Sequence, residues 1–553
     1  MDLDEKIPAE RVEVSRRRFL ELAGLGGAAM LASPALAKAP QRADISARGF
    51  PVKAFELEEA TIADLQAGLQ NGKYTAVSLA QKYLARIEEI DKRGPAINAV
   101  IEINPDALAI ARALDKERKT RGLRGPLHGI PMLIKDNLDT HDRMTTTAGS
   151  LALAGSMPAQ DSFVAKKLRE AGAVIMGKAN LSEWANFRSN HSSSGWSGRG
   201  GQTRNPYALD RNPSGSSSGS GAAVSANLCA VAIGTETDGS IVSPSSANGL
   251  VGIKPTVGLV SRSGIIPISH SQDTAGPMAR TVTDAAILLG GLTGVDPRDP
   301  ITEESVGKSH RDYSKFLDPN GLRGARIGVA RKFFGFHAQV DKVMAGALQE
   351  MKRLGAVLVD PVNFEGKFGD AEFQVMLYEF KADLNAYLAA LGPSAPVHSL
   401  QEVIEFNEKN KAKEMPYFGQ ETLLKAAEKG PLTETAYVEA LAKCRRLSRE
   451  EGIDAVLNEH RLDAIVAPTA GPAWTTDLVN GNHGTGGSSS LAAVAGYPSI
   501  TVPAGSVFGL PVGLSFFSKA YREPTLLKLA FSFEQGTRFR QPPRFLPTAD
   551  LRG

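Results

Sequence analysis

The chain has 553 residues, of which 42% are hydrophobic and 22% charged, with 55 Gly, 32 Pro and only 2 Cys. This is the composition of an ordinary soluble globular protein, and it excludes a collagen-like, a disulfide-stapled or a wholly disordered chain. The formal net charge is only +3, so charge gives no reason to expect nucleic acid or an anionic membrane as a partner.

The N-terminal segment has the parts of an export signal. Residues 15–20, Ser-Arg-Arg-Arg-Phe-Leu, form a twin-arginine pattern, a Gly/Ala-rich apolar run covers residues 22–32, and residues 35–37, Ala-Leu-Ala, resemble a cleavage site. The apolar run is shorter than the about 20 residues that a transmembrane helix needs. We therefore expect residues 1–37 to be a twin-arginine signal peptide, with a solvated basic arm as the alternative, and residues 38–55 to be a flexible lead-in. The mature protein is expected to be periplasmic or secreted, without a membrane anchor.

Helices, and then alternating strands and helices, are predicted after the lead-in. Apolar residues recur at helical spacing between residues 61 and 119, which predicts helices that pack on a surface. From residue 127 onward, short apolar runs alternate with helical segments, first at residues 130–134, 173–176 and 230–233. Strands that alternate with helices indicate an α/β core around a largely buried sheet.

A long section with a helical pattern separates these strands from a second set. Residues 296–460 are more charged and mostly helical in pattern. Strand-like runs return at residues 464–467, 499–502 and 512–516, and a closing helix is predicted at 524–534.

Together these elements predict one large α/β domain over residues 56–545, with a mixed central sheet covered by helices on both faces. Both ends of the domain are expected to complete the sheet. The catalytic core is predicted at about 126–290 and 460–540, and a helical excursion at about 296–460.

Cysteine and histidine patterns predict neither a metal nor a cofactor. Cys229 and Cys444 have no C-x-x-C or metal-ligand spacing. We interpret them as packed or unreactive thiols, with a disulfide between them as an alternative. No cluster of His, Cys or carboxylate residues has the sequence spacing of a metal site.

A glycine- and serine-rich segment is the most unusual feature of the chain. Residues 213–221 are Pro-Ser-Gly-Ser-Ser-Ser-Gly-Ser-Gly, an apolar helix follows, and residues 234–240 are Gly-Thr-Glu-Thr-Asp-Gly-Ser. Such runs are often flexible linkers, but this one lies between core-like strands and helices. Gly-rich turns next to a helix or strand expose backbone N–H groups, which suit an anion or a developing oxyanion.

Two common motifs match this region only formally. Gly215, Ser217 and Gly219 fit the G-x-S-x-G nucleophile elbow, but that elbow follows a buried strand, whereas residues 207–213 are polar and contain proline. Residues 172–178 resemble a phosphate-binding loop, but their centre has a strand pattern, and alanine replaces the magnesium-binding Ser/Thr. Neither motif therefore predicts the chemistry of this region.

Several motifs in order carry a more specific resemblance. They are residues 129–137 (Gly-Ile-Pro-Met-Leu-Ile-Lys-Asp-Asn), 213–221, 234–240, 252–256 (Gly-Ile-Lys-Pro-Thr) and 496–503 (Gly-Tyr-Pro-Ser-Ile-Thr-Val-Pro). With these motifs the chain resembles the amidase signature family from about residue 60 to about residue 539. Agreement of several ordered motifs is far more specific than that of one short pattern.

The resemblance implies a Ser-Ser-Lys triad with Lys135 as base, Ser216 as bridging serine and Ser240 as nucleophile. A serine hydroxyl is a weak nucleophile until a base removes its proton. A lysine can be that base only if desolvation lowers its pKa from about 10.4 toward neutrality. The apolar run before Lys135 could carry its side chain into a low-dielectric interior.

The resemblance also implies how the rest of the site is built. It predicts a cis peptide bond between Gly215 and Ser216, with Gly215 and Ser217 shaping the turn. Asn180 and Glu183 match the family and are expected to brace the site, with a helix cap or a surface role as the alternatives. Lys254 is expected to be structural. The backbone N–H groups expected to hold the oxyanion are those of Thr237, Asp238, Gly239 and Ser240.

One departure from the common pattern points to a substrate. Many family members carry Gly-Gly-Ser followed by arginine two residues later, whereas this chain has Asp238-Gly239-Ser240-Ile241-Val242. In this it resembles bacterial peptide amidases, which release ammonia from C-terminal peptide amides. Export suits such a substrate and argues against a subunit of a tRNA-dependent amidotransferase. The alternatives are a general aliphatic or aromatic amide or ester hydrolase, an esterase that uses Ser217, and an exported non-catalytic binding protein.

Overall fold

The computed structural model describes residues 49–364 and 367–551. These residues belong to one compact unit that spans residues 46–553. The predicted signal peptide and most of the predicted lead-in lie outside the described residues. Among the residues that the structure describes, no helix is long and apolar enough to cross a membrane.

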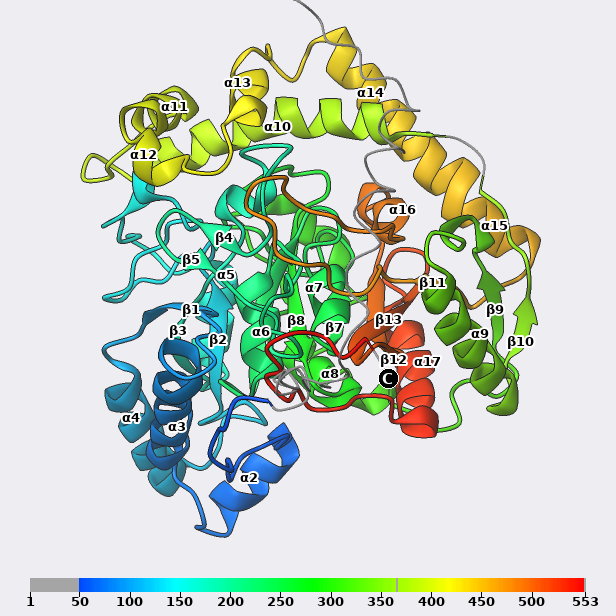
Figure 1. The fold of residues 1–553 in the computed structure, drawn as a ribbon, viewed down its shortest axis with the longest axis horizontal. Coiled ribbons are helices and arrows are strands. Elements are labelled where there is room, and N and C mark those ends of the chain that lie inside the picture. The colour runs from blue at the N-terminus through cyan, green and yellow to red at the C-terminus, as the bar shows by residue number, and fades with distance from the viewer. Residues whose placement is uncertain (1–48, 365–366, 552–553) are drawn as a thin grey trace, which may run out of the picture. The chain divides into compact units, whose positions relative to one another are not determined.

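A mixed sheet of 11 strands forms the centre of the fold (Figure 1). In spatial order its strands are β1 (Val100–Ile103), β3 (Val174–Ala179), β2 (Pro131–Lys135), β6 (Val231–Glu236), β8 (Thr274–Ala279), β7 (Val251–Lys254), β12 (Ser499–Val507), β13 (Leu510–Phe517), β11 (Ala464–Pro468), β9 (Arg326–Val329) and β10 (Val357–Val359). β2 pairs in parallel with β3 and β6, whereas β12 and β13 form an antiparallel hairpin. A second sheet contains only β4 (Trp196–Ser197) and β5 (Gly201–Gln202).

Helices flank this sheet on both faces, as the sequence predicted. They are α2 (Ile62–Gln70), α3 (Ala76–Arg86), α4 (Ala107–Arg121), α5 (Phe163–Glu170), α6 (Ser218–Ser225), α7 (Val242–Ala247), α8 (Val282–Gly290), α9 (Ala338–Arg353), α10 (Gly369–Ala390), α11 (Leu400–Lys409), α12 (Lys411–Glu414), α13 (Glu421–Ala427), α14 (Thr435–Arg445), α15 (Asp454–Glu459), α16 (Ser489–Val494) and α17 (Glu523–Thr537). α6 and α7 pack on the central strands and on each other, and α8, α9 and α17 form another packed group. Strands covered in this way need apolar residues on both sides, which explains the continuous apolar runs in the sequence.

The first helices begin at the polar residues that the sequence places before them. Thr61 and Asp64 form a reciprocal capping box at the start of α2, and Thr75 and Ser78 do the same at α3. Each box satisfies N–H groups that the first helical turn leaves without a partner. α3 and α4 then pack on each other and on β3.

The predicted helical excursion at about 296–460 is only partly helical. Its first part contributes β9 and β10, which extend the sheet in parallel beyond β11. These strands are too short to stand out in the surrounding pattern, since they have four and three residues. From α10 onward the excursion is mostly helical, and α10 to α14 lie along one side of the fold in Figure 1.

Helices α10 to α14 form a helical cover, and one hydrophobic cluster packs this cover against loops that connect the strands of the sheet. Leu377, Phe380 and Leu384 of α10 pack in one buried cluster with Trp184 and Ile266. The cover is therefore part of the domain's packing, and it places α10 beside segments that follow β2, β3 and β7.

The two cysteines are free thiols, so the structure does not support a disulfide between them. Both are buried, and burial raises the pKa of each thiol to about 12. They are unreactive by this criterion, because the thiolate is the reactive form.

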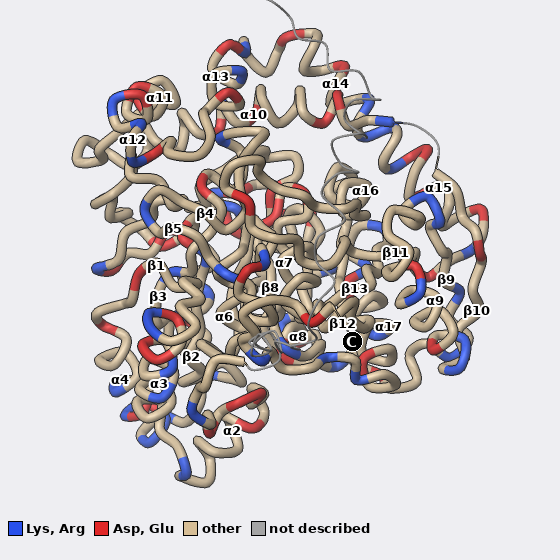
Figure 2. Tube along the Cα trace, in the orientation of Figure 1, with Lys and Arg blue, Asp and Glu red and all other residues tan. Residues whose placement is uncertain are grey.

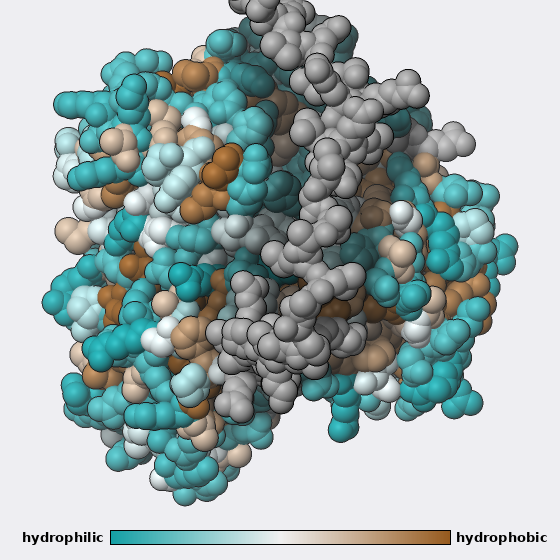
Figure 3. Space-filling view, viewed as in Figure 1, coloured by the Kyte–Doolittle hydropathy of each residue, from teal (hydrophilic) through white to brown (hydrophobic). Residues whose placement is uncertain are grey.

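The surface agrees with the charge balance of the sequence. Positive and negative residues are interspersed along the outer helices in Figure 2. On the face drawn in Figure 3, hydrophobic residues form small separate groups between hydrophilic ones.

Candidate active site

Lys135 lies at the end of β2, where the strand delivers its side chain into the interior. The side chain is fully buried, and its Nζ lies 2.8 Å from Ser216 Oγ and 2.8 Å from Thr235 Oγ1. Burial lowers the pKa of Lys135 to about 7, although the negative charges of Asp273 and Glu236 oppose this change. A large fraction of this amine is therefore neutral near pH 7 and able to accept a proton.

The glycine- and serine-rich segment brings Ser216 to the amine. The Gly215–Ser216 peptide bond is cis, as the family resemblance implied. The Ser217 N–H donates to the carbonyl of Ser240 (3.2 Å), which ties this segment to the turn after β6. A Cβ at Gly219 would lie 2.5 Å from the backbone nitrogen of Asn180, so this close approach requires glycine.

Ser240 differs from the serines around it because its side chain is partly exposed. Ser216 and Ser217 are fully buried. Gly239 has φ 78°, and a Cβ there would lie 2.9 Å from Ser489 Oγ. Within the described residues, 49–364 and 367–551, the N–H groups of Asp238, Gly239 and Ser240 donate to no acceptor. Three free donors beside a partly exposed serine form the arrangement that an oxyanion needs.

A buried carboxylate holds the chain immediately after Ser240. Glu236 Oε2 accepts hydrogen bonds from the N–H groups of Ile241 (2.7 Å) and Val242 (3.0 Å). Lys254 is fully buried, and its positive charge opposes the rise in the pKa of Glu236 that burial causes. Lys254 thus acts on the site through Glu236, in line with its predicted structural role.

Ser217 is not placed to act as a nucleophile. Its Oγ donates to the carbonyl of Thr235 (3.0 Å) and accepts from the N–H of Thr235 (3.1 Å). Both interactions fasten it to β6 in the interior. The esterase alternative that uses Ser217 therefore conflicts with the structure, and Ser217 shapes the turn instead.

A cavity of about 360 Å³ adjoins the residues that contact Lys135. Its lining includes Asn137, Thr235 and Thr237, and α10 contributes Asp383 and Tyr387. Its remaining lining residues are Ala185, Glu236, Arg262, Ser263, Ile265, Ile266, Pro267, Ile268, His270, Asp273, Thr274, Arg298, Asp299 and Ala386. The volume lies within the range of about 300–1,000 Å³ typical of small-molecule sites.

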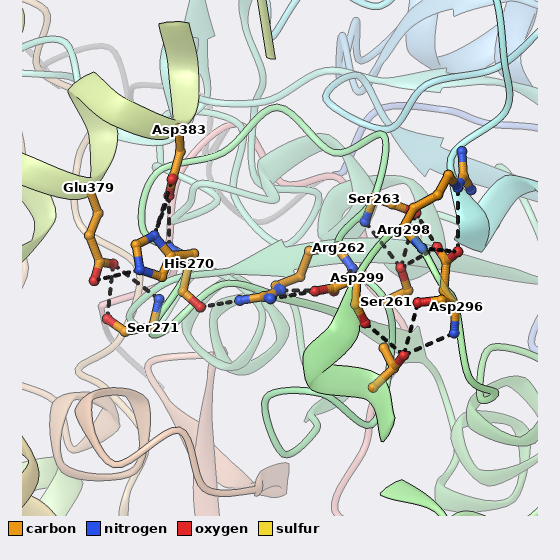
Figure 4. Close-up of polar contacts among 11 residues, drawn as sticks. Ser261, Arg262, Ser263, His270, Ser271, Asp296, Arg298, Asp299, Glu379 and Asp383 are labelled. Carbon is orange, nitrogen blue, oxygen red and sulfur yellow. Dashed lines mark hydrogen bonds and ion pairs between the residues drawn. The ribbon is translucent and has the colours of Figure 1, made fainter. Parts of the chain in front are cut away.

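A polar network makes one wall of this cavity rigid (Figure 4). The Arg262 guanidinium donates two hydrogen bonds to the Asp299 carboxylate and a third to the carbonyl of His270. The His270 ring lies between two carboxylates of α10, with Nδ1 2.9 Å from Asp383 Oδ2 and Nε2 3.3 Å from Glu379 Oε1. The network therefore ties the loop before β8 to the helical cover.

His270, Glu379 and Asp383 form a cluster in space that has no counterpart in sequence spacing. Their potential ligand atoms lie within 4.8 Å of one another. The sequence could not indicate this group, because the histidine lies more than 100 residues from either carboxylate. Each carboxylate already has protein partners, and Glu379 also accepts from Tyr437 Oη (2.7 Å) and the Ser271 N–H (3.0 Å).

Comparison with known proteins agrees with this geometry. The chain matches the Amidase family over residues 78–527. It belongs to the amidase family. Its sequence is 52% identical to that of native peptide amidase from Stenotrophomonas maltophilia. The crystal structure of that enzyme matches with a TM-score of 0.85 over 89% of this chain and 100% of that one.

Two further relatives support the assignment. A structure of the peptide amidase PAM with the competitive inhibitor chymostatin is 52% identical to this chain, with a TM-score of 0.86 over 88% of this chain and 100% of that one. A probable amidase of Arabidopsis thaliana is 45% identical over 506 residues, which is 89% of this chain and 93% of the relative. The fold and the amide hydrolase class therefore follow from both sequence and structure.

In this amidase, Asn180 and Glu183 are buried and hold the β4–β5 hairpin. Asn180 accepts from Ser197 Oγ (2.7 Å) and donates to Thr203 Oγ1 (3.0 Å). Glu183 accepts from the Gly198 N–H and forms an ion pair with Arg188 (3.0 Å), with both side chains fully buried. Neither residue lies on the surface, so the surface alternative does not apply.

Proposed function

We propose that this amidase hydrolyses the C-terminal carboxamide of peptides through Lys135, Ser216 and Ser240, releasing ammonia and a peptide acid. The observation that carries the proposal is the 2.8 Å contact between Lys135 Nζ and Ser216 Oγ in a fully buried site. Burial supplies a base near neutral pH, and the exposed Ser240 lies on the turn with three free N–H donors.

The reaction begins with proton transfer to a neutral amine. Lys135 Nζ accepts the Ser216 proton while Ser216 Oγ takes the proton of Ser240, and Ser240 Oγ forms a bond to the carboxamide carbon. The N–H groups of residues 238–240, which form the nucleophile turn, stabilise the oxyanion. When this tetrahedral intermediate collapses, the C–N bond breaks and Ser216 donates a proton to the leaving nitrogen, which departs as ammonia. Ser216 then regains a proton from the Lys135 ammonium, which leaves the amine neutral again. Water then hydrolyses the acyl-enzyme to the peptide acid and restores Ser240.

The cavity and the relatives support a peptide substrate. The cavity volume of about 360 Å³ has room for an amino-acid-sized acyl group. Apolar residues such as Ile266 and Ile268 line it together with the polar network of the loop before β8. The two solved relatives named peptide amidase are 52% identical to this chain.

The test measures ammonia released by residues 38–553 from C-terminally amidated dipeptides and from simple aliphatic and aromatic amides. We expect release from peptide amides with a kcat/KM at least about tenfold higher than from the simple amides, because the cavity adds acyl-side contacts. Release from simple amides alone would retain the mechanism and reject the peptide substrate. A protein that binds amides and releases no ammonia would instead be the non-catalytic binding protein.

We also propose that the protein is exported by the twin-arginine route. The support is the sequence of residues 15–20 and of residues 35–37. Replacing Arg16 and Arg17 together with lysine is expected to keep the uncleaved chain in the cytoplasm of a bacterial host. The wild-type chain should appear in the periplasm with an N-terminus at Lys38, as read by mass spectrometry. Equal export of both chains would reject the route.

A further inference from the structure

Asp273 lines the cavity and holds the residue that lies just before the nucleophile turn. Its side chain is partly exposed toward this cavity. Thr237 Oγ1 donates a hydrogen bond to Asp273 Oδ1 (2.6 Å). Asp273 Oδ2 accepts from the N–H groups of Ile268 (2.8 Å) and Ser269 (2.9 Å). One carboxylate therefore ties the chain after β6 to the loop before β8.

The preceding residue holds Thr237 by its backbone. Gln272 Nε2 donates to the carbonyl of Thr237 (3.3 Å). This carbonyl belongs to the same peptide unit as the N–H of Asp238, and a peptide unit is planar. Holding the carbonyl therefore fixes the direction of this N–H, which finds no acceptor among residues 49–364 and 367–551. Gln272 and Asp273 together fix the carbonyl and the hydroxyl of Thr237.

The Asp273 carboxylate also acts on the base through its charge. Burial raises the pKa of Asp273 to about 6, and the hydrogen bonds from Thr237, Ile268 and Ser269 oppose this rise. Asp273 is therefore mostly ionised above pH 7. Burial lowers the pKa of Lys135 to about 7, and the negative charge of Asp273 opposes that change because it favours the protonated amine.

We propose that Asp273 is a positioning residue for amide hydrolysis, whose carboxylate anchors Thr237 at the start of the nucleophile turn and places a negative charge near the Lys135 amine. The inference rests on the proposed function, since it requires Ser240 as nucleophile and Lys135 as base. Asp273 acts through Thr237 and Lys135 and does not touch the reacting atoms.

The other charged groups that line the cavity have partners of the opposite kind. These pairs are Arg262 with Asp299, His270 with Asp383, Arg298 with Asp296, and Glu236 with Lys254. Asp273 is instead held by a hydroxyl and two backbone N–H groups. All four pairs are present in the wild type and in every variant at residue 273, so they do not account for a difference between them.

The first experiment removes the charge of Asp273 and keeps its shape. Asparagine accepts from the N–H groups of Ile268 and Ser269 through Oδ1, and its Nδ2 donates to Thr237 Oγ1. We expect Asp273→Asn to keep kcat within about tenfold of the wild type and to move the midpoint of the rise in kcat/KM from about 7 to a pH lower by about 0.5–1 unit. Initial rates with a C-terminally amidated dipeptide from pH 5 to 9 measure both values.

The second experiment removes the anchor and keeps the charge. Thr237→Val has nearly the shape of threonine but no hydroxyl to donate to Asp273 Oδ1. We expect kcat to fall about tenfold with KM changed less than about threefold, because the oxyanion donors lose their fixed direction. The midpoint near pH 7 should stay at the wild-type value, since the carboxylate is still present.

A matched control separates these effects from the loss of any buried carboxylate. Asp284 in α8 is buried and accepts from the N–H of Ile62 (3.1 Å). Burial raises its pKa to about 6, the same value as for Asp273. Asp284→Asn is expected to leave the midpoint of kcat/KM unchanged, because this carboxyl group contacts neither Thr237 nor the cavity.

Three results would overturn the inference. They are an Asp273→Asn enzyme with the wild-type midpoint, a Thr237→Val enzyme with wild-type kcat, and an Asp284→Asn enzyme with the same shift as Asp273→Asn. If Asp273→Asn does not fold, the kcat of Thr237→Val decides alone. A Ser240→Ala enzyme that still releases ammonia would instead reject the proposed function itself, so the two failures are distinguishable.

Discussion

Replacing Ser240 with alanine is expected to lower kcat for amide hydrolysis by about 10,000-fold or more, the scale of loss seen when a nucleophilic serine is removed. Ser240 is the serine of the Gly/Ser-rich site segments that combines partial exposure with free N–H donors in its own turn. Without its Oγ no acyl-enzyme can form, and the remaining donors can only bind substrate. Ammonia release measures turnover, and mass spectrometry of the acylated protein measures formation of the acyl-enzyme.

Ser217→Ala is the matched control for this substitution. Ser217 is buried, and its Oγ is hydrogen-bonded to both the carbonyl and the N–H of Thr235. Loss of this hydroxyl therefore removes packing and two hydrogen bonds but no reacting atom. We expect Ser217→Ala to keep acyl-enzyme formation and to lower kcat by about tenfold or less. Ammonia release that survives Ser240→Ala and disappears with Ser217→Ala would reverse the assignment.

The main strands of the fold could be predicted because they are long, apolar and buried on both faces. β2 and β6 each overlap a predicted run, and β13 contains one. β9 and β10 could not be recognised in this way. They have only four and three residues, and Arg326 and Gly328 interrupt the apolar pattern of β9.

Lys135, Ser216 and Ser240 could be named because each sits in a short ordered motif. The structure adds the contact between Lys135 and Ser216, which no spacing can show because 81 residues separate them. Other contacts near the site also join residues that lie far apart in the chain. Gln272 Nε2 donates to Glu372 Oε1 (3.1 Å), 100 residues away, and to the carbonyl of Thr237 (3.3 Å).

Glu236 is the case in which a local signal did exist. It is an acidic residue at the end of an otherwise buried strand, which is costly unless the carboxylate has partners. Its partners are the two N–H groups just after Ser240. A buried charge inside a predicted core strand could therefore have marked it as a residue that holds the site.

Replacing Lys135 with methionine is expected to lower kcat/KM by about 1,000-fold or more, because no other basic group of the described residues contacts Ser216 Oγ. The wild-type kcat/KM should rise with pH through about 7. Lys135 is protonated below its pKa of about 7 and cannot accept the Ser216 proton there, whereas an ordinary lysine would stay charged up to about 10.5. The residual activity of Lys135→Met should lack this rise, and initial rates from pH 5 to 9 measure it.

Two further variants distinguish a lost base from a lost charge or a damaged fold. Lys135→Arg keeps a cation, but arginine cannot give up its proton at these pH values, so it should be as inactive as Lys135→Met. Lys178 is also fully buried with a lowered pKa, yet its Nζ contacts Leu138 O and Thr146 Oγ1 rather than the triad. Lys178→Met should therefore keep the rise near pH 7 even if it unfolds at a lower temperature.

The pH dependence of stability is an independent test of the lowered pKa of Lys135. Unfolded Lys135 holds its proton up to about 10.5 and the folded form only up to about 7, so burial of this amine costs most stability below pH 7. The cost declines as pH rises from about 7 to 10.5, and Lys135→Met removes it. An inactive Lys135→Met enzyme whose Tm depends less on pH than that of the wild type would show a buried neutral lysine. An unchanged pH dependence of Tm, together with wild-type activity, would contradict the role of Lys135 as the base.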